Sequence, residues 1–479
     1  MSKKNNNEWN EKLAINDILC KRGEFSTKEG LTFLGEFIID KNKVWFRGSS
    51  CNEDTAIFIK EQRDFPENTH ICGVVSGVGV TIMAPDIYKT TDSRDGDGIL
   101  ISMSAIVIGM QFYEQITVSQ ICVELPELDR FMRPLKVSRN PDGTFNSDEI
   151  IEARWRNGII SLYDTRIPTT RNGFRGVHYV RFAVKNGMEV LSAASELKTF
   201  CSLFVFLADY DICLPPEIEF IGNNKQGSEA IIYLNGITKI NNECKGKEFC
   251  ILSYAVLPNM QHICTNYEHF IYNNENDILI KTYIELFRTP SGSINRFLDL
   301  ARIIESFSRK NRKGNPEIIC RKIGCHKQAS KCEQVCCTCK HQDSCCKKCN
   351  DICCSFNARC IDMFKEYGNH LLSSCLAAHF AEDRSANIDS QKIEKICDEI
   401  KTLRNYYTHL FVAKEKVKRI LDERGDNACD YYSNILHLLL LSAIYKNIGI
   451  SDVNIRRGLA KTNEHFSELI DKKFDSPDI

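Results

Sequence analysis

The segment LRNYYTHL contains three residues, Arg404, Asn405 and His409, whose types suit the cleavage of RNA. Histidine has an ordinary pKa near ~6.5, so His409 could take the proton of an attacking 2′-hydroxyl. Arginine is always charged and forks onto phosphate oxygens, so Arg404 could stabilise the negative phosphorane that forms. This chemistry needs no catalytic metal and leaves a 2′,3′-cyclic phosphate and a 5′-hydroxyl. DNA lacks the attacking hydroxyl and should not be cut.

A helix must position these groups, and the apolar spacing around them predicts one over residues 388–423. Residues four apart share a helix face, so Asn405 and His409 should lie together. Arg404 and His409 are five apart and diverge on a regular helix. A joint site therefore needs a helix end at the motif or a second copy of it. The apolar stripe consists of Ile396, Ile400, Leu403 and Leu410.

Other side chains near the motif are weaker candidates. Asp398 and Glu399 precede it and could orient Arg404 or a second copy's His409, although helix surfaces carry acids routinely. The pair Tyr406–Tyr407 could simply pack. The competing interpretation of the whole motif is an arginine and a histidine that share a structural helix by chance.

A dense cysteine cluster is the second feature with chemical potential. Twelve of the 24 cysteines fall between Cys320 and Cys360, where eight Lys/Arg outnumber three Asp/Glu. C-x-x-C pairs at this density predict structural zinc, with ligands for two ions. A disulfide knot and an iron–sulfur cluster are the alternatives. The expected ligands are Cys320, Cys325, Cys332, Cys336, Cys339, Cys346, Cys349 and Cys353, with Cys337, Cys345, Cys354, Cys360, His326 and His341 as alternates.

Composition and charge narrow the class of protein. A hydrophobic content of 43% and a charged content of 26% are ordinary for a soluble chain with a sizeable core. The net charge of -1 argues against a general nucleic-acid coat. The N-terminus MSKKNNNEWNEKL has no apolar core typical of a secretory signal, and the apolar runs 98–112 and 435–445 are shorter than the ~20 residues of a membrane helix. We therefore expect a cytoplasmic protein without a membrane partner.

Two kinds of secondary structure follow each other along the chain. Short Val- and Ile-rich runs over 17–125 and about 150–270 predict strands, with the glycine-rich GVVSGVGV forming strands and a turn. The run VLSAASELKTFCSLFVFLAD predicts a helix that leads into a buried strand. After residue 275, helical spacing predicts a bundle of four or five helices, which a cysteine-rich insert interrupts. The expected helices beyond that insert span 361–382, 388–423, 429–447 and 451–472.

The segment LRNYYTHL resembles the signature of HEPN domains, in which an arginine, a polar residue and a histidine end a helix of a compact bundle. HICGVVSGVGVTIMAPDIYKT and the following AIVIGMQFYEQITVSQICVELPELDRFM resemble the N-terminal domain of ApeA-type proteins, which are bacterial anti-phage proteins. The resemblance implies an α+β multidomain chain. A β-rich sensor or regulatory region over 1–275, with a split near 130–150, would precede a HEPN nuclease domain over 276–479. The zinc-binding insert would occupy 318–360.

This resemblance also implies an activity. Arg404, Asn405 and His409 would be the catalytic residues of an endoribonuclease. HEPN ribonucleases generally dimerise, so two motif helices would build one composite site in a homodimer. The substrate would be host RNA, transfer RNA in particular, and a phage-derived trigger would start abortive infection. The alternative is a non-catalytic HEPN adaptor whose zinc insert contacts a partner, since a cysteine-rich insert is not a general feature of the family.

Overall fold

The computed structural model describes most of the chain and divides it into two compact units. The first unit comprises Met1–Cys201 and Ile212–Lys245, and the second comprises Ser202–Asp211 and Gly246–Ile479. A β-rich N-terminal region and a helical C-terminal region are thereby confirmed. The described residues are 19–40, 43–61, 63–66, 69–75, 77–93, 96–112, 116–125, 128, 131, 151–168, 174–209, 217–222, 229–234, 249–251, 253–273, 276–288, 292–311, 356–373, 389–409, 414–424 and 427–462.

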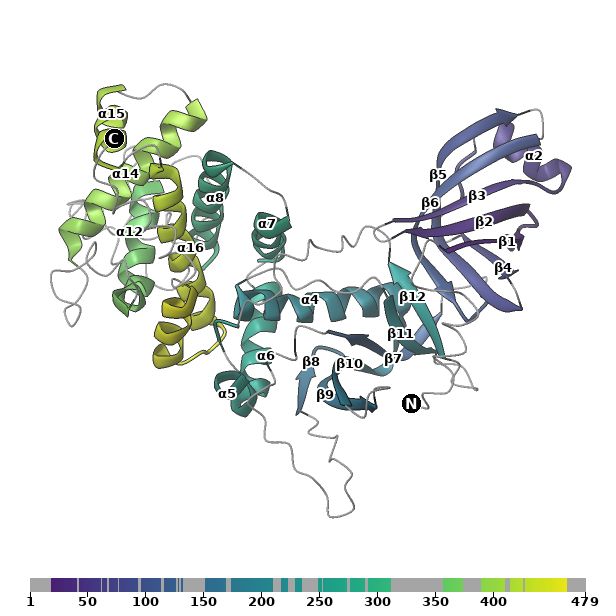
Figure 1. Cartoon of the computed structure of the whole chain (residues 1–479), viewed down its shortest axis with the longest axis horizontal. Helices are drawn as coiled ribbons and strands as arrows, with labels where there is room; N and C mark the ends of the chain where they lie inside the picture. The colour runs from purple at the N-terminus through teal and green to yellow at the C-terminus, as the bar shows by residue number, and fades with distance from the viewer. Residues whose placement is uncertain are drawn as a thin grey trace, which may run out of the picture. The chain divides into compact units, whose positions relative to one another are not determined.

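Six strands of the first unit close into an antiparallel barrel (Figure 1). The order is β3-β2-β1-β4-β5-β6, and the first part of β6 closes the ring by pairing with β3, Trp45 opposite Ser102. The last part of β6, from Ala105, pairs instead with β12 and so joins the barrel to the rest of the sheet. The barrel strands are β1 (Leu19–Ser26), β2 (Thr32–Asp40), β3 (Lys43–Ser50), β4 (His70–Val75), β5 (Val78–Ser93) and β6 (Gly96–Ile108).

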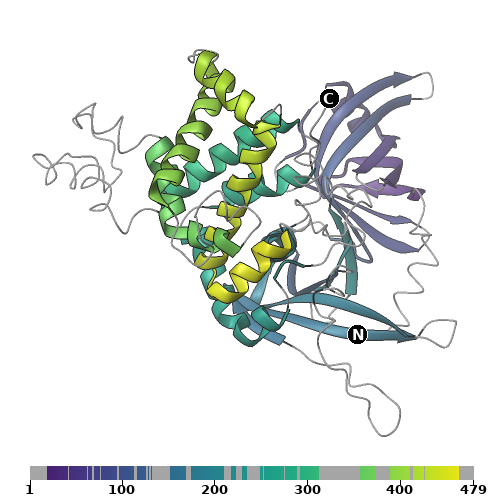
Figure 2. The ribbon, with the colours of Figure 1, turned by 60° about the vertical axis from the view of Figure 1, so that its left-hand side comes forward.

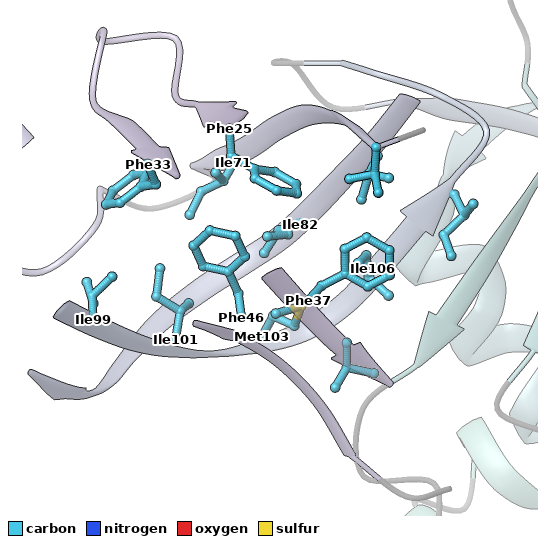
Figure 3. Close-up of a cluster of buried hydrophobic side chains, with 14 of the residues drawn as sticks. Phe25, Phe33, Phe37, Phe46, Ile71, Ile82, Ile99, Ile101, Met103 and Ile106 are labelled. Atoms are coloured by element: carbon cyan, nitrogen blue, oxygen red, sulfur yellow. The ribbon is translucent and has the colours of Figure 1, made fainter. Parts of the chain in front are cut away.

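Aromatic and aliphatic side chains fill the interior of this barrel (Figure 3). Alternate residues of a strand point to opposite faces, so Phe33 and Phe37 are buried while Leu34 between them is 38% exposed. Gly35 lies on the buried face, where an added Cβ would collide with the ring of Phe46. The interior is therefore a packed core, with a glycine where a large ring must approach the backbone. Helix α2 (Glu53–Lys60) also contributes buried side chains to it.

The other six strands extend the same sheet from β6. Strand β7 pairs with both β10 and β11, which follow the stretch 132–150, so one sheet crosses the position of the expected split. The first part of helix α4 packs on this half, where Phe200 meets Trp155 edge-on with ring centroids 5.5 Å apart. The strands are β7 (Thr117–Glu124), β8 (Ile151–Trp155), β9 (Gly158–Pro168), β10 (Phe174–Glu189), β11 (Glu217–Gly222) and β12 (Glu229–Leu234).

Helix α4 (Val190–Ala208) corrects one prediction. The run expected to change from helix to buried strand is helical throughout, because a short apolar stretch looks alike in both states. In the described ranges, α4 is the one helix long and apolar enough to cross a membrane, and 67% of its most apolar window is buried inside the protein. The core helix of a protein can have the same length and apolar composition as a membrane-spanning helix. The glycine-rich segment does form the strands β4 and β5 and the turn between them, as expected.

The second unit is a helical bundle (Figure 2). Helix α16, one of its two 20-residue helices, has buried residues along its whole length and packs against α8 and α12. The helices are α5 (Ser253–Val256), α6 (Met260–Glu268), α7 (Asp277–Arg288), α8 (Ser293–Asn311), α12 (Phe356–Tyr367), α14 (Ser390–His409), α15 (Lys414–Arg424) and α16 (Ala428–Asn447), with shorter turns η2 (Leu257–Asn259), η3 (His269–Asn273) and η4 (Gly368–Ser373) and a last helical segment over 452–462.

Two boundaries in this unit differ from those expected. Residues 253–273 were expected in the β-rich region but are helical and belong to the second unit, since their apolar residues pack with the end of α4. Ser202, for example, is hydrogen-bonded to Tyr267 at 2.6 Å. The single helix expected over 388–423 is instead two helices, because α14 ends at His409 and α15 begins at Lys414.

A buried polar cluster fixes the end of α4 within the second unit. Asp209 adopts a positive φ of 55° and places its carboxylate against α16 and α7. Its Oδ1 lies 2.6 Å from His437 Nε2 and accepts a hydrogen bond of 2.8 Å from the Tyr283 hydroxyl. Burial raises the pKa of Tyr283 well above its ordinary value, and the neighbouring Asp209 raises it further. Tyr283 therefore remains a hydrogen-bond donor at neutral pH.

Candidate active site

Helix α14 carries the Arg–His motif, and its own sequence explains where it begins and which face it buries. The side chain of Asp389 accepts a hydrogen bond of 2.8 Å from the amide of Gln391, which caps the first turn. The predicted stripe of Ile396, Ile400 and Leu403 is buried, so this part of the prediction is confirmed. Leu410, the fourth member of the stripe, lies outside the described residues.

The end of α14 gives the three motif residues different surroundings. Arg404 and Asn405 are half-buried, whereas His409 is exposed as the last residue of the helix. The guanidinium of Arg404 lies 3.5 Å from the amide oxygen of Asn405. Within the described part of the chain, no hydrogen bond or ion pair joins His409 to either of them. The helix end that a joint site would need is present, but one copy of the motif does not bring its histidine onto its arginine.

Three neighbours hold the guanidinium of Arg404. Its Nη2 donates a hydrogen bond of 3.0 Å to Oε2 of Glu305 on α8. Its Nη1 faces Asn405, and its central carbon lies 5.2 Å from the centre of the Phe356 ring on α12. A guanidinium above an aromatic face is attracted by the ring quadrupole. Arg404 is therefore anchored from α8, from α12 and from its own helix.

Glu305 binds a second arginine through its other oxygen. Arg359 on α12 donates from Nη1 to Oε1 of Glu305 at 3.1 Å. The side chain of Arg359 is 9% exposed and that of Glu305 is 16% exposed, while that of Arg404 is 25% exposed. One carboxylate thus lies between two guanidinium groups, and the more exposed of the two belongs to the motif.

Comparison with known families finds one similarity, and it lies in the helical bundle. A family model described as Apea-like HEPN matches residues 298–453, which run from α8 to the last helical segment and contain Glu305, Arg404 and His409. Residues 298–453 are thus similar to Apea-like HEPN domains. HEPN domains are typically ribonucleases. No curated protein and no solved structure matched the chain. The resemblance of the segments over 70–90 and 105–132 to ApeA-type proteins lies outside the matched residues and stays a prediction.

Two tyrosines and Thr408 lie between Asn405 and His409. The rings of Tyr406 and Tyr407 meet edge-on with centroids 5.1 Å apart. Burial raises the pKa of Tyr407 to about 12, and contact with Cys429 on α16 contributes to the rise. A phenol with this pKa stays protonated at neutral pH and cannot act there as a general base. Tyr407 thus packs against α16, in line with the interpretation that the tyrosine pair has a packing role.

The acidic neighbours proposed from the sequence are not the partners of Arg404. Glu399 is 4% exposed and accepts a hydrogen bond of 2.5 Å from the Tyr432 hydroxyl, so it joins α14 to α16. Asp398 is exposed, and its carbonyl accepts a hydrogen bond from the Thr402 hydroxyl at 2.7 Å. The carboxylate that binds Arg404 is Glu305, which is 99 residues away in the chain. Local spacing therefore could not identify it.

The expected metal ligands fall almost entirely outside the described residues. Cys360 is the exception, and it is fully buried in α12 beside Cys397 of α14. Burial raises the pKa of Cys397 well above its ordinary value, and the contact with the Cys360 thiol raises it further. Among the residues that the structure describes, no group of three or more His, Cys, Asp or Glu side chains is arranged to hold a metal ion. The pair Cys360–Cys397 alone does not fit a zinc site, since zinc binds four ligands.

The ligands that lie outside the described residues are Cys320, Cys325, Cys332, Cys336, Cys339, Cys346, Cys349, Cys353, Cys337, Cys345, Cys354, His326 and His341.

Proposed function

We propose that this protein is a metal-independent endoribonuclease that acts as a toxin in bacterial anti-phage defence. The observation that carries the proposal is the complete Arg404-Asn405-x-x-x-His409 motif at the end of a helix within the HEPN domain. The half-buried, anchored Arg404 supports a phosphate-binding role, and the exposed His409 is accessible to a substrate.

The proposed reaction uses the RNA's own nucleophile. His409 takes the proton of a 2′-hydroxyl, whose oxygen then forms a bond to the adjacent phosphorus. Arg404 donates to the phosphate oxygens as negative charge gathers on the phosphorane. The bond from phosphorus to the 5′-oxygen of the next nucleotide breaks, and that oxygen gains a proton. The products are a 2′,3′-cyclic phosphate and a 5′-hydroxyl, and electrons and protons balance without a redox step.

A homodimer would complete this site. Arg404 and His409 are five apart on one helix, and no hydrogen bond or ion pair joins these two described residues in a single chain, so two α14 ends facing each other would bring the arginine of one chain near the histidine of the other. The exposure of Thr408 and His409 at the helix end supports this arrangement. We propose that the dimer forms through the HEPN domain.

The proposed biological role rests on the similarity to the family. We propose that the substrate is host RNA, in particular transfer RNA, and that its cleavage in the bacterial cytoplasm stops translation before phage mature. The β-rich N-terminal region is proposed to sense a phage-derived trigger and to restrain the HEPN domain until then. The cysteine-rich segment 318–360 is proposed to bind two structural zinc ions, because its C-x-x-C pairs supply thiolates at the spacing zinc uses.

A second candidate function is a non-catalytic HEPN adaptor that contacts a partner. The ion pair of Arg404 with Glu305 favours it, because a structural arginine inside a bundle would make the same bond. The two functions differ in what the motif variants do. In an adaptor, replacing His409, which lies at an exposed helix end, should have little effect on the function of the protein.

Expression of the protein in bacteria, with and without phage infection, tests the proposal. We expect His409→Ala and Arg404→Ala to abolish toxicity and RNA cutting while the protein remains folded and dimeric, with a loss of at least ~100-fold in cutting by the purified protein. Matched controls are His262→Ala on α6 and Arg302→Ala on α8, two exposed residues away from the motif. Toxicity equal to wild type in both motif variants would refute the mechanism.

A further inference from the structure

The carboxylate of Glu305 is divided between two arginines. Its Oε2 accepts from Arg404 at 3.0 Å and its Oε1 accepts from Arg359 at 3.1 Å, so each oxygen serves one guanidinium. An arginine and a carboxylate by themselves favour a bidentate pair, in which two N–H groups bind both oxygens. Here Arg404 makes one contact, with Oε2, while Arg359 holds Oε1.

The single contact leaves most of the Arg404 guanidinium available. A guanidinium has five N–H donors, and Arg404 directs one to Glu305 and one toward Asn405. Its other donors have no acceptor among the residues that the structure describes. The Phe356 ring covers one face of the group at 5.2 Å. The guanidinium is thus held in place and still has N–H donors that can bind a ligand.

The two arginines of the cluster differ in exposure. Arg359 is the more buried arginine, and Arg404 is the more accessible one. Arg404 is therefore the guanidinium of the pair that an anion in solvent can reach more readily.

We infer that Glu305 and Arg359 are positioning residues of the ribonuclease: Glu305 orients Arg404 by a single-point contact, and Arg359 holds the other oxygen of Glu305 and so fixes the orientation of that carboxylate. This inference rests on the proposed function. An arginine held in one rotamer binds a phosphate without first losing side-chain freedom, which is why fixed groups favour the transition state. Arg404 remains the residue that touches the RNA, and Glu305 and Arg359 act through it.

The first test removes the charge of Glu305 in the full-length protein. A misplacement of about 1 Å can cost ~100-fold in rate, so we expect Glu305→Gln to lower kcat by ~10- to 100-fold on a purified transfer RNA that the wild type cuts. KM should change less than about threefold, because Arg404 acts mainly on the phosphorane. The matched control is Asp299→Asn, which breaks an ion pair with Arg302 on the same helix and should leave kcat unchanged.

The second test separates positioning from mere folding. Arg359→Gln removes the guanidinium that holds Oε1 of Glu305, so the carboxylate can turn and shift Arg404, and kcat should fall ~10-fold or more while the melting temperature is monitored. In the Glu305→Gln background the same Arg359→Gln change should lower kcat less than twofold further, because its effect passes through Glu305. A purely structural role would lower the yield of folded dimer and leave the kcat of the folded fraction at the wild-type value.

The outcomes distinguish this inference from the proposed function. Loss of cutting in Arg404→Ala and His409→Ala together with wild-type kcat in Glu305→Gln would overturn the inference alone. Wild-type cutting in the two motif variants would overturn the proposed function itself. If Glu305→Gln does not fold, the double variant, which removes both charges together, and Arg359→Gln alone remain as tests. Wild-type kcat in both would then overturn the inference.

Discussion

At the scale of single residues, the motif shows how much of a site is local in sequence. Arg404, Asn405 and His409 lie within one short segment, so a ribonuclease motif could be predicted from their types and spacing. Glu305 and Phe356, which hold Arg404, come from other helices and belong to no local pattern. Their side chains meet Arg404 only because α8, α12 and α14 pack together, which residue spacing along one helix does not reveal.

His370 is a second residue whose role only the structure shows, and it makes stability depend on pH. Its Nδ1 lies 2.7 Å from the Ser442 hydroxyl and its Nε2 lies 3.1 Å from Asp452. Burial lowers the pKa of His370 below 6.5, and the positive Lys446 and Arg456 add to this while Asp452 opposes it. The folded protein therefore favours the neutral imidazole.

The sign of the effect follows from linkage. Below pH 6.5 the unfolded chain binds a proton at His370 that the folded chain resists, so the free energy of unfolding should fall as the pH falls from 6.5 through the lowered pKa. Urea unfolding at pH 7.5 and at pH 5.5 measures the loss. His370→Gln should reduce the difference between the two pH values, and His262→Gln on an exposed face should not. A difference unchanged by His370→Gln would contradict this assignment.

At the scale of elements, periodicity predicted helices better than it predicted where they end. The helix expected over 429–447 corresponds to α16 (Ala428–Asn447), because long apolar periods are unambiguous. The helix expected over 388–423 is divided after His409, although charged residues with high helix propensity continue beyond the motif. This helix end was one of the two alternatives that the sequence left open for a site built from Arg404 and His409, the other being a second copy of the motif.

Helix α4 shows why the sequence predicted a strand where the structure has a helix. The stretch FCSLFVFLA is apolar on every side, so no period of 2 or 3.6 can be recognised in it. Phe204, Val205 and Phe206 are all at most 2% exposed, which explains the uniform pattern. Closure of the barrel was also beyond prediction, because the pairing of β3 with β6 joins segments about 50 residues apart.

At the scale of the whole molecule, the proposed zinc ions give a prediction independent of catalysis. The purified protein should contain about two zinc ions per chain by elemental analysis, held by thiolates of the cysteine-rich segment. Replacing Cys336 and Cys339 by serine should lower the zinc content by about one ion. The control is Cys51→Ser, which changes an exposed free cysteine in the first unit. An absence of bound zinc, or a brown iron-containing protein, would contradict the assignment.

The proposed reaction is cleavage of an RNA through attack by the RNA's own 2′-hydroxyl, assisted by Arg404 and His409. The most direct measurement uses an RNA that the wild type cuts and the same RNA with a single 2′-deoxy nucleotide at the cut position. We predict 2′,3′-cyclic phosphate and 5′-hydroxyl ends from the first RNA in the presence of EDTA, and no cut at the modified position in the second. Cleavage at the 2′-deoxy position, or ends with a 3′-hydroxyl and a 5′-phosphate, would contradict the account.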